Sequence, residues 1–169
     1  MIRDAKPVDY PAVAELMRAF IRWHYDRHAS DRAMIDGYFD EAAYENELAS
    51  LPSYYAPPTG ALLVAEQDGR VVGCIALKRL DDNRCEMKRL FVDRSAHGTG
   101  AGAALAEALI ERAKVLGYSR MMLDTGPKQV EAQGLYRKLG FRDCEPYYGM
   151  SPELEQWLVF MELNLVGAR

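Results

Sequence analysis

A glycine-rich segment constrains the fold of this chain more than any other feature. Glycines occupy positions 98, 100 and 102, between an apolar run that ends at Val92 and an Ala/Leu/Glu-rich run over 103–116. This order predicts a strand, a loop and a helix, because glycine accepts backbone conformations that a Cβ forbids. The first N–H groups of a helix lack internal partners, and the helix dipole adds positive potential there. The sequence therefore predicts a loop that binds a phosphate-bearing ligand.

Two known phosphate-binding loops compare with this segment. A Walker A loop is excluded, because no Gly-Lys-Ser/Thr follows the glycines. The dinucleotide fingerprint is matched by Gly98-x-Gly100-x-x-Ala103, and Asp124 follows about twenty residues later. That fingerprint expects its first glycine close after a strand of a βαβ unit, whereas five residues separate Val92 from Gly98 and hairpin-like strands precede them. NAD binding is the weaker alternative and stays open on these residues.

Hydrophobic periodicity and turn residues outline the remaining elements. The predicted strands cover 1–4, 61–67, 71–80, 85–92, 121–124, a segment beginning at Phe141, and 157–165. The predicted helices cover the run from Val13 to Ile21 with its flanks, then 41–51, 101–116 and 130–139, and the proline-rich 51–60 segment is predicted to be a loop. Short turns make consecutive strands antiparallel, and the helix crossover makes 121–124 parallel to 85–92. These patterns predict a mixed sheet with helices on both faces.

A second motif follows the loop about thirty residues later. The loop reads His97-x-x-Gly100-x-Gly102, and the second motif reads Ala132-x-x-Leu135-Tyr136-Arg137-Lys138-Leu139-Gly140-Phe141. With both motifs in this order, the chain from about Ile2 to Leu165 resembles the GNAT acyl-CoA N-acyltransferases. The resemblance implies an α+β fold in one GNAT domain over 1–169: a mixed, mostly antiparallel sheet flanked by helices, with a splayed parallel strand pair that binds acyl-CoA.

The implied activity is the transfer of the acetyl group of acetyl-CoA to a primary amine by direct attack in a ternary complex. The acceptor would be a small molecule or a peptide. Two alternatives remain: a transferase that uses another acyl-CoA, and a non-catalytic module that only binds acyl-CoA. No residue stands out in the sequence as a covalent nucleophile.

The resemblance also implies which residues hold the cofactor. In this family the strand before the loop bonds the pantetheine arm through its backbone, often at a bulge, and the loop holds the pyrophosphate. The implied cofactor-binding residues are Leu90, Phe91, Val92, His97, Gly98, Thr99, Gly100, Ala101, Gly102, Ala103, Gln129 and Tyr136. Two of them depart from the family pattern: His97 replaces the usual Arg or Gln, and Gln129 replaces a frequent Asn.

Three side chains are expected to serve the chemistry. Tyr136 matches the family tyrosine that protonates the departing thiolate; without that context it would be a core tyrosine. An amine with a pKa of about 10.4 is mostly protonated at neutral pH, so a carboxylate must bind it or remove its proton. Glu86, inside the strand before the loop, and Asp124, at the end of the strand after it, are the candidates. A surface or salt-bridged carboxylate is an equal alternative for each.

Other side chains are expected to have simpler roles. His24 and His28 are four residues apart, a spacing that can share a metal ion, but no third ligand is evident, so two exposed histidines and no metal site are predicted. The residues placed near the acceptor cleft by resemblance are Trp23, Tyr25, Tyr54 and Tyr55, with Tyr147, Tyr148 and the 149–156 loop opposite. Core packing is the favoured alternative for any one of the first four.

The net charge and the composition limit which partners and which cellular compartment are expected. The net charge of −4 argues against non-specific nucleic-acid binding and slightly favours a cationic acceptor. No apolar run has the length of a membrane span, and the first residues do not have the pattern of a signal peptide, so a cytoplasmic protein without a membrane partner is expected. The three cysteines have no metal-ligand spacing, and Cys74 and Cys85 are expected to be buried thiols. A monomer and a homodimer are both compatible with the sequence.

Overall fold

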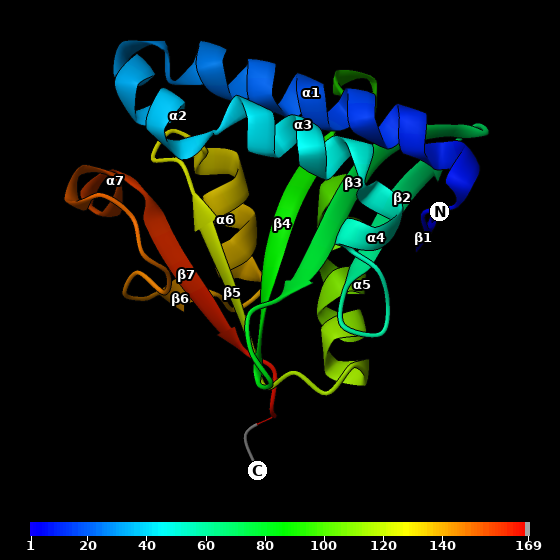
Figure 1. Ribbon diagram of the computed structural model, residues 1–169. Helices are drawn as coiled ribbons and strands as arrows, with labels where there is room; N and C mark the ends of the chain where they lie inside the picture. The colour runs from blue at the N-terminus through cyan, green and yellow to red at the C-terminus, as the bar shows by residue number, and fades with distance from the viewer. Residues whose placement is uncertain (168–169) are drawn as a thin grey trace.

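The computed structural model describes residues 1–167 and is organised around one seven-stranded sheet of strand order β1-β2-β3-β4-β5-β7-β6 (Figure 1). The strands are β1 (Ile2–Asp4), β2 (Ala61–Gln67), β3 (Arg70–Arg79), β4 (Arg84–Val92), β5 (Arg120–Thr125), β6 (Arg142–Asp143) and β7 (Val159–Asn164). Neighbouring strands are antiparallel except for the parallel pair β4 and β5. The predicted mixed, mostly antiparallel sheet with one parallel pair is confirmed.

Helices cover both faces of this sheet. The helices are α1 (Tyr10–Arg27), α2 (Arg32–Tyr38), α3 (Glu41–Ala49), α4 (Leu51–Tyr54), α5 (Ala101–Val115), α6 (Val130–Lys138) and α7 (Pro152–Trp157). Strand β2 supplies both cores because its side chains alternate: Leu63 packs with α5, whereas Leu62 and Val64 pack with α1 to α4. The sheet is therefore buried on both sides, as its nearly continuous apolar strands indicate.

The sequence prediction missed three helices. Pro52 led to the prediction of a loop over 51–60, but it lies in the first turn of α4, where the missing N–H has no intrahelical partner to lose. Helix α2 contains Gly37, and α7 follows Pro152, so short helices were hidden by residues that usually mark loops. Helix α7 also occupies residue 157, which shortens the last strand from the predicted 157–165 to Val159–Asn164.

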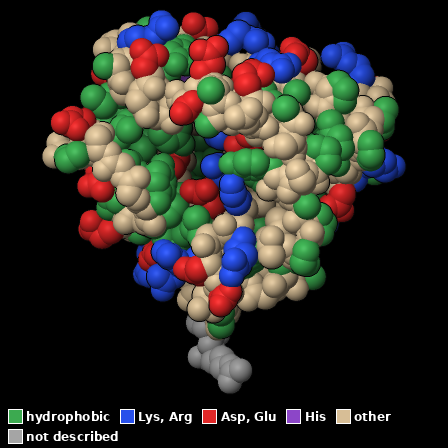
Figure 2. Space-filling view, in the orientation of Figure 1, with side chains coloured by type: hydrophobic (Ala, Val, Ile, Leu, Met, Phe, Trp, Pro, Cys, Tyr) green, Lys and Arg blue, Asp and Glu red, His purple; other side chains and the backbone are tan. Residues whose placement is uncertain are grey.

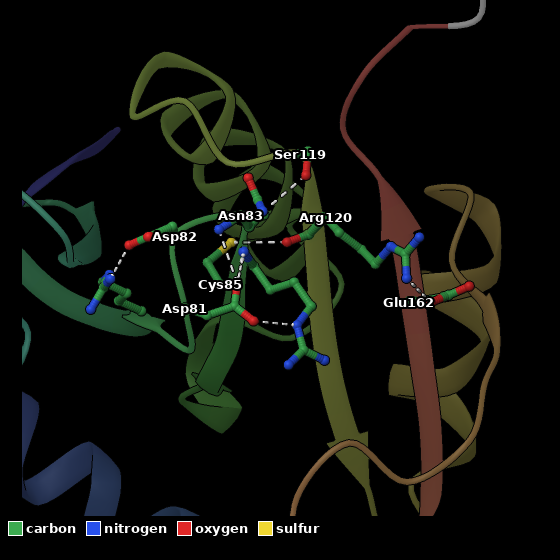
Figure 3. Close-up of polar contacts among 9 residues, drawn as sticks. Asp81, Asp82, Asn83, Cys85, Ser119, Arg120 and Glu162 are labelled. Carbon is green, nitrogen blue, oxygen red and sulfur yellow. Dashed lines mark hydrogen bonds and ion pairs between the residues drawn. The ribbon is translucent and has the colours of Figure 1, made fainter.

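The β4–β5 pair is fastened at one end only. Arg84 pairs with Arg120, Cys85 with Met121 and Glu86 with Met122, and no further pairing follows between these two strands. Figure 3 shows the fastened end, where the carbonyl oxygen of Asn83 accepts the backbone N–H of Ser119 at 2.9 Å and of Arg120 at 3.2 Å. Toward α1 and α2 the two strands move apart (Figure 1).

Two further expectations concern the side chains and the helices. Cys74 and Cys85 are free and buried, as predicted. Burial raises the pKa of each thiol to about 12, so both stay protonated at neutral pH. Within residues 1–167, no helix combines the length and the apolar character that a bilayer crossing requires.

Candidate active site

The open end of the β4–β5 pair is shaped by a bulge in β4. Cys74 of β3 pairs with Phe91 and Ala76 pairs with Lys88, so Arg89 and Leu90 together oppose one residue of β3. Arg89 has a φ of +60°, a left-handed conformation that is uncommon for a residue with a Cβ. Such an outlier persists only where the surrounding structure holds it, and it commonly marks a functional segment.

The side chain of Arg89 is held by a buried ion pair. Its Nε and Nη2 donate to the two carboxylate oxygens of Glu47 at 2.9 and 3.0 Å, and its guanidinium lies over the ring of Tyr44. Side-chain exposure is 11% for Arg89 and 3% for Glu47. The guanidinium lowers the pKa of Glu47 against the opposing effect of burial, so the pair stays charged. This contact ties the bulge of β4 to α3.

Two adjoining cavities lie at this open end. The larger has a volume of about 330 Å³ and lies between α2, α3, β4 and the loop that carries Tyr148. The smaller has a volume of about 40 Å³ and reaches Leu90, Gln129 and Tyr136. The residues that line both cavities are Tyr38, Glu86, Lys88, Arg89 and Asp124. Figure 2 shows this face hollowed near its centre, with acidic and basic side chains gathered in the hollow.

Both candidate acids lie at the junction of the cavities. Asp124 accepts hydrogen bonds from the hydroxyls of Tyr38 and Tyr148, one on each carboxylate oxygen. Glu86 is 7% exposed, and its Oε2 accepts the hydroxyl of Tyr147 at 2.5 Å. Its Oε1 lies 3.6 Å from Nζ of Lys88. The structure thus brings the two acids together, although they come from different strands.

Tyr136 points to the same junction from α6. It is 7% exposed and lines the smaller cavity. Burial, with the negative charge of Asp124, raises the pKa of Tyr136 well above its ordinary value, so the hydroxyl is protonated at neutral pH. Burial likewise raises the pKa of Tyr38, Tyr147 and Tyr148. The Tyr136 hydroxyl therefore carries a proton at neutral pH, and its raised pKa makes it a weaker acid than a free tyrosine.

The glycine loop has the geometry expected of an anion site. Gly98 and Gly100 have φ values of +77° and +83°, and a Cβ on either would meet nothing within 4 Å. Gly100 is the N-cap of α5. The hydroxyl of Thr99 bonds back to the carbonyl oxygen of Ala96 at 2.6 Å, which fixes the loop. The first N–H groups of the 15-residue α5 therefore follow directly after an exposed, glycine-lined turn.

The three residues at the end of β4, just before the glycine loop, have different surroundings. Leu90 lines the smaller cavity at the bulge, and Phe91 is paired with Cys74 of β3. The carbonyl oxygen of Val92 lies 3.0 Å from Nε2 of His97, which gives that histidine a place beside the strand end. Ala101, Gly102 and Ala103 form the first turn of α5.

Gln129 is turned inward at the start of α6. Its side-chain oxygen accepts hydrogen bonds from the Thr125 hydroxyl at 2.8 Å and from the Gly126 N–H at 2.5 Å. The residue is 8% exposed and lines the smaller cavity. Its amide oxygen thus shapes the turn between β5 and α6, where sequence reasoning expected a contact with the cofactor.

The prediction of two exposed histidines was wrong. His24 is 3% exposed and His28 is fully buried, with their rings stacked 5.5 Å apart. His28 donates from Nδ1 to the carbonyl oxygen of His24 and accepts the Lys128 N–H on Nε2 at 3.2 Å, so it fastens α1 to the β5–α6 turn. Within the described part of the chain, no group of three or more His, Cys, Asp or Glu side chains is arranged to hold a metal ion.

The aromatic side chains named from the sequence divide between the larger cavity and other contacts. Tyr54 and Tyr148 line the larger cavity, and Tyr147 bonds Glu86. Trp23 lies under the guanidinium of Arg27, Tyr25 bonds Asp36, and Tyr55 is a core residue, so these three have structural contacts instead. Sequence reasoning missed four residues of the site, which are Tyr38, Glu47, Lys88 and Arg89. Only Glu47 could have been noticed in the sequence, because it is an acidic residue at a position where the helical spacing of 41–51 predicts a buried apolar side chain.

Comparison with protein families gives one family match and related chains. The family model described as "Acetyltransferase (GNAT) family" matches residues 14–141. An uncharacterised N-acetyltransferase of Schizosaccharomyces pombe is 40% identical over 106 residues, covering 62% of this chain and 65% of its own length. Human N-acetylaspartate synthetase is 37% identical over 141 residues, covering 79% of this chain and 46% of its own. The chain thus spans less than two thirds of either relative.

Solved structures of similar fold extend over nearly the whole chain. A GNAT-family acetyltransferase from Staphylococcus aureus has a TM-score of 0.78 at 22% identity, covering 98% of this chain and 99% of its own. A Salmonella typhimurium protein solved with its cofactor acetyl-CoA has a TM-score of 0.66 at 23% identity, covering 100% and 95% of the two chains. These likenesses concern the fold.

Proposed function

Because the chain belongs to the GNAT acetyltransferase family, we propose that it transfers the acetyl group of acetyl-CoA to an amine by direct attack in a ternary complex. The observation that carries this proposal is the junction of the two cavities at the open end of β4 and β5. There a protonated Tyr136 faces the smaller cavity and two carboxylates, Glu86 and Asp124, reach the larger one. Residues 1–169 would constitute one GNAT domain.

The cofactor would lie across the open strand end. The loop 98–103, with His97 beside it, would hold the pyrophosphate on the N–H groups that begin α5. The pantetheine arm would run along the backbone of Leu90, Phe91 and Val92, in the gap where β5 no longer pairs with β4. Gln129 would support the wall of the thioester site. The small volume of the inner cavity, about 40 Å³, favours a short acyl group.

The chemistry needs one acid and one base. A carboxylate takes one proton from the ammonium, and the neutral nitrogen attacks the thioester carbonyl carbon. The C–S bond breaks, the thiolate takes the hydroxyl proton of Tyr136, and the second proton that leaves the nitrogen restores the Tyr136 hydroxyl by way of solvent. Glu86 is the better placed base, because Oε1 carries only the Lys88 contact at 3.6 Å, whereas both oxygens of Asp124 accept tyrosine hydroxyls. Asp124 would then orient Tyr38 and Tyr148 around the amine.

Direct attack is supported by the lining of the cavities. Among the described residues that line them, none is a cysteine or a serine. Cys74 and Cys85 lie in the two cores with raised pKa values, so neither is a ready nucleophile. The hydroxyl of Thr125, which lines the smaller cavity, donates to the side-chain oxygen of Gln129 at 2.8 Å, so it too is engaged within the protein.

Ligand-induced stabilisation is the first test. Acetyl-CoA and desulfo-CoA should each raise the melting temperature, since a ligand at a hundred times its Kd stabilises the folded state by about 2.7 kcal/mol. NAD and ATP should not. A shift with NAD alone would restore the dinucleotide interpretation of the loop. A shift with acetyl-CoA but no release of CoA thiol with any amine would identify a binding module.

Tyr136→Phe tests the proposed acid. We expect turnover to fall about 100-fold while the Kd for acetyl-CoA stays unchanged, because only proton donation is lost. Tyr118→Phe is the matched control, since its hydroxyl bonds the Thr59 carbonyl oxygen and lines neither cavity. Full activity in Tyr136→Phe would make Tyr136 a packing residue and leave the thiolate to be protonated by water.

A further inference from the structure

The larger cavity carries charges of both signs where it meets the smaller one. Of the acidic side chains that line the larger cavity, Asp40 and Glu47 do not reach the smaller one, and Glu47 is paired with Arg89. Glu86 and Asp124, with the basic Lys88 and Arg89, line both cavities. The hollow in Figure 2 shows the same mixture of acidic and basic side chains. The volume of about 330 Å³ suits one small molecule. The charges inside this volume, more than the net charge of the chain, decide which acceptor it holds.

The two basic side chains keep donors that the chain does not use. Arg89 engages Glu47 through Nε and Nη2, and among residues 1–167 its Nη1 donates to no protein acceptor. Nζ of Lys88 is 3.6 Å from Glu86 Oε1, beyond hydrogen-bond distance, and has no other carboxylate partner in the described chain. Its side chain is 24% exposed, so the ammonium is reachable from the cavity. These donors are suited to a carboxylate.

The acidic side chains are suited to binding the amino group of a ligand that also carries a carboxylate. Glu86 and Asp124 line the junction that Tyr136 also reaches, where an attacking amine must lie. A second cationic group placed beside Lys88 and Arg89 would be repelled by them. A neutral tail would leave the Lys88 ammonium with only its 3.6 Å contact to Glu86 Oε1. An amine that carries a carboxylate satisfies both sets of groups.

We propose that the acceptor is a free amino acid, whose amino group lies at Glu86 and Asp124 and whose carboxylate is bound by Lys88 and by Nη1 of Arg89. This inference rests on the proposed acetyltransferase function and specifies its substrate class. The nitrogen gives a proton to Glu86 and acquires the acetyl group as the C–S bond of acetyl-CoA breaks, while the thiolate takes the proton of Tyr136. The carboxylate of the amino acid takes no part in the reaction.

Paired acceptors test the carboxylate directly. The common amino acids, their carboxamides and the corresponding decarboxylated amines are compared by release of CoA thiol. The best amino acid should exceed its own carboxamide in kcat/KM by about 10-fold to 100-fold, the usual effect of hydrogen bonds to a charged group. A carboxamide or decarboxylated amine that reacts as well as the amino acid would overturn the inference and leave the acetyltransferase proposal intact.

A lysine variant locates the carboxylate site. Lys88→Met should raise the KM for the amino acid and collapse its preference over the carboxamide to about 3-fold or less, because the ammonium donor is lost. Lys114→Met is the matched control, since Lys114 lies on α5 and pairs with Glu111 at the surface. An unchanged preference in Lys88→Met would refute the assignment.

The remaining outcomes separate this inference from the function on which it rests. Stabilisation by acetyl-CoA with turnover of other amines but of no amino acid would overturn the amino-acid assignment alone. Stabilisation by acetyl-CoA without thiol release from any amine would overturn the transferase function and leave a binding module. Absence of both stabilisation by acetyl-CoA and thiol release with any amine would overturn the proposed function, and the assignment with it.

Discussion

The two ends of the β4–β5 pair differ in what fills the space between the strands. At the fastened end, the chain supplies its own partners: the Asn83 carbonyl oxygen bonds Ser119 and Arg120, and Cys85 Sγ lies 3.7 Å from the Arg120 carbonyl oxygen (Figure 3). At the open end, pairing stops after Glu86 and Met122. Side chains from helices and loops far away in sequence take the place of the missing strand contacts.

The open end therefore depends on charged and polar side chains. The Glu47–Arg89 pair holds the β4 bulge to α3, and tyrosine hydroxyls hold Asp124 and Glu86. Such groups are expensive to bury and strongly destabilising when only one partner is left. The contacts at the open end, where a ligand is expected, are therefore made by side chains and depend on both partners being present. The contacts at the fastened end, where no ligand is expected, are made mainly by the backbone.

Removal of Glu47 should give the largest effect. Glu47→Ala leaves the Arg89 guanidinium buried without its partner, so the free energy of unfolding should fall by about 3–5 kcal/mol, measured by urea denaturation. The proposed acetyltransferase activity should fall as well, because the bulge loses its contact with α3.

The same helix offers a matched control for that variant. Glu45→Ala breaks an exposed contact with Arg18, in which the two side chains are 53% and 40% exposed, and should have a far smaller effect. Equal destabilisation by the two variants would show that the pair at the open end has no special role and that the helix alone accounts for the loss.

The sequence predicted most of the sheet because its signals are local. Asp68-Gly69 marks a hairpin turn, both of its residues have positive φ, and the flanking strands pair as expected. The glycine loop and Tyr136 were found because each lies in a short motif. The helices α2, α4 and α7 were missed because their lengths, 7, 4 and 6 residues, are too short for a periodic pattern to emerge.

The wall of the site could not be predicted in the same way. Tyr38 meets Asp124 across 86 positions, and Glu47 meets Arg89 across 42. The local sequence around Tyr38 or Glu47 does not indicate which residue it contacts. The contacts form only when α2 and α3 pack across the open ends of the strands. The buried histidines were misjudged for the same reason: their neighbours include Trp157 and Lys128, which are remote in sequence.

The pH dependence of the free energy of unfolding should report on the open end, where His24 lines the smaller cavity. Burial first, then the charges of His28 and Arg89, lower the pKa of His24 from 6.5 to about 3. Between these values the unfolded chain binds a proton that the folded chain does not, so stability contributed by neutral His24 is present above pH 6.5 and is lost as the pH falls toward 3. The slope is about 1.4 kcal/mol per pH unit for one such group.

Two variants isolate this contribution. His24→Phe should remove the slope between about pH 6 and pH 4 in urea denaturation, measured as the difference from the wild type. His97→Gln, at an exposed position beside the glycine loop, should keep it. A wild-type slope that survives in His24→Phe would assign the acid sensitivity to other groups, with His28 next in line because burial lowers its pKa too.

The smallest effect is expected at the fastened end. Ser119→Ala removes the hydroxyl bond to the Asn83 carbonyl oxygen at 3.2 Å, but the backbone N–H bond to the same oxygen remains. The free energy of unfolding should change by about 0.5 kcal/mol or less, and kcat and KM should equal those of the wild type. The remaining backbone hydrogen bonds should be enough to close this end. A large loss of activity in Ser119→Ala would therefore mean that the two ends are coupled, and that contacts at the fastened end determine how far β4 and β5 separate at the open end.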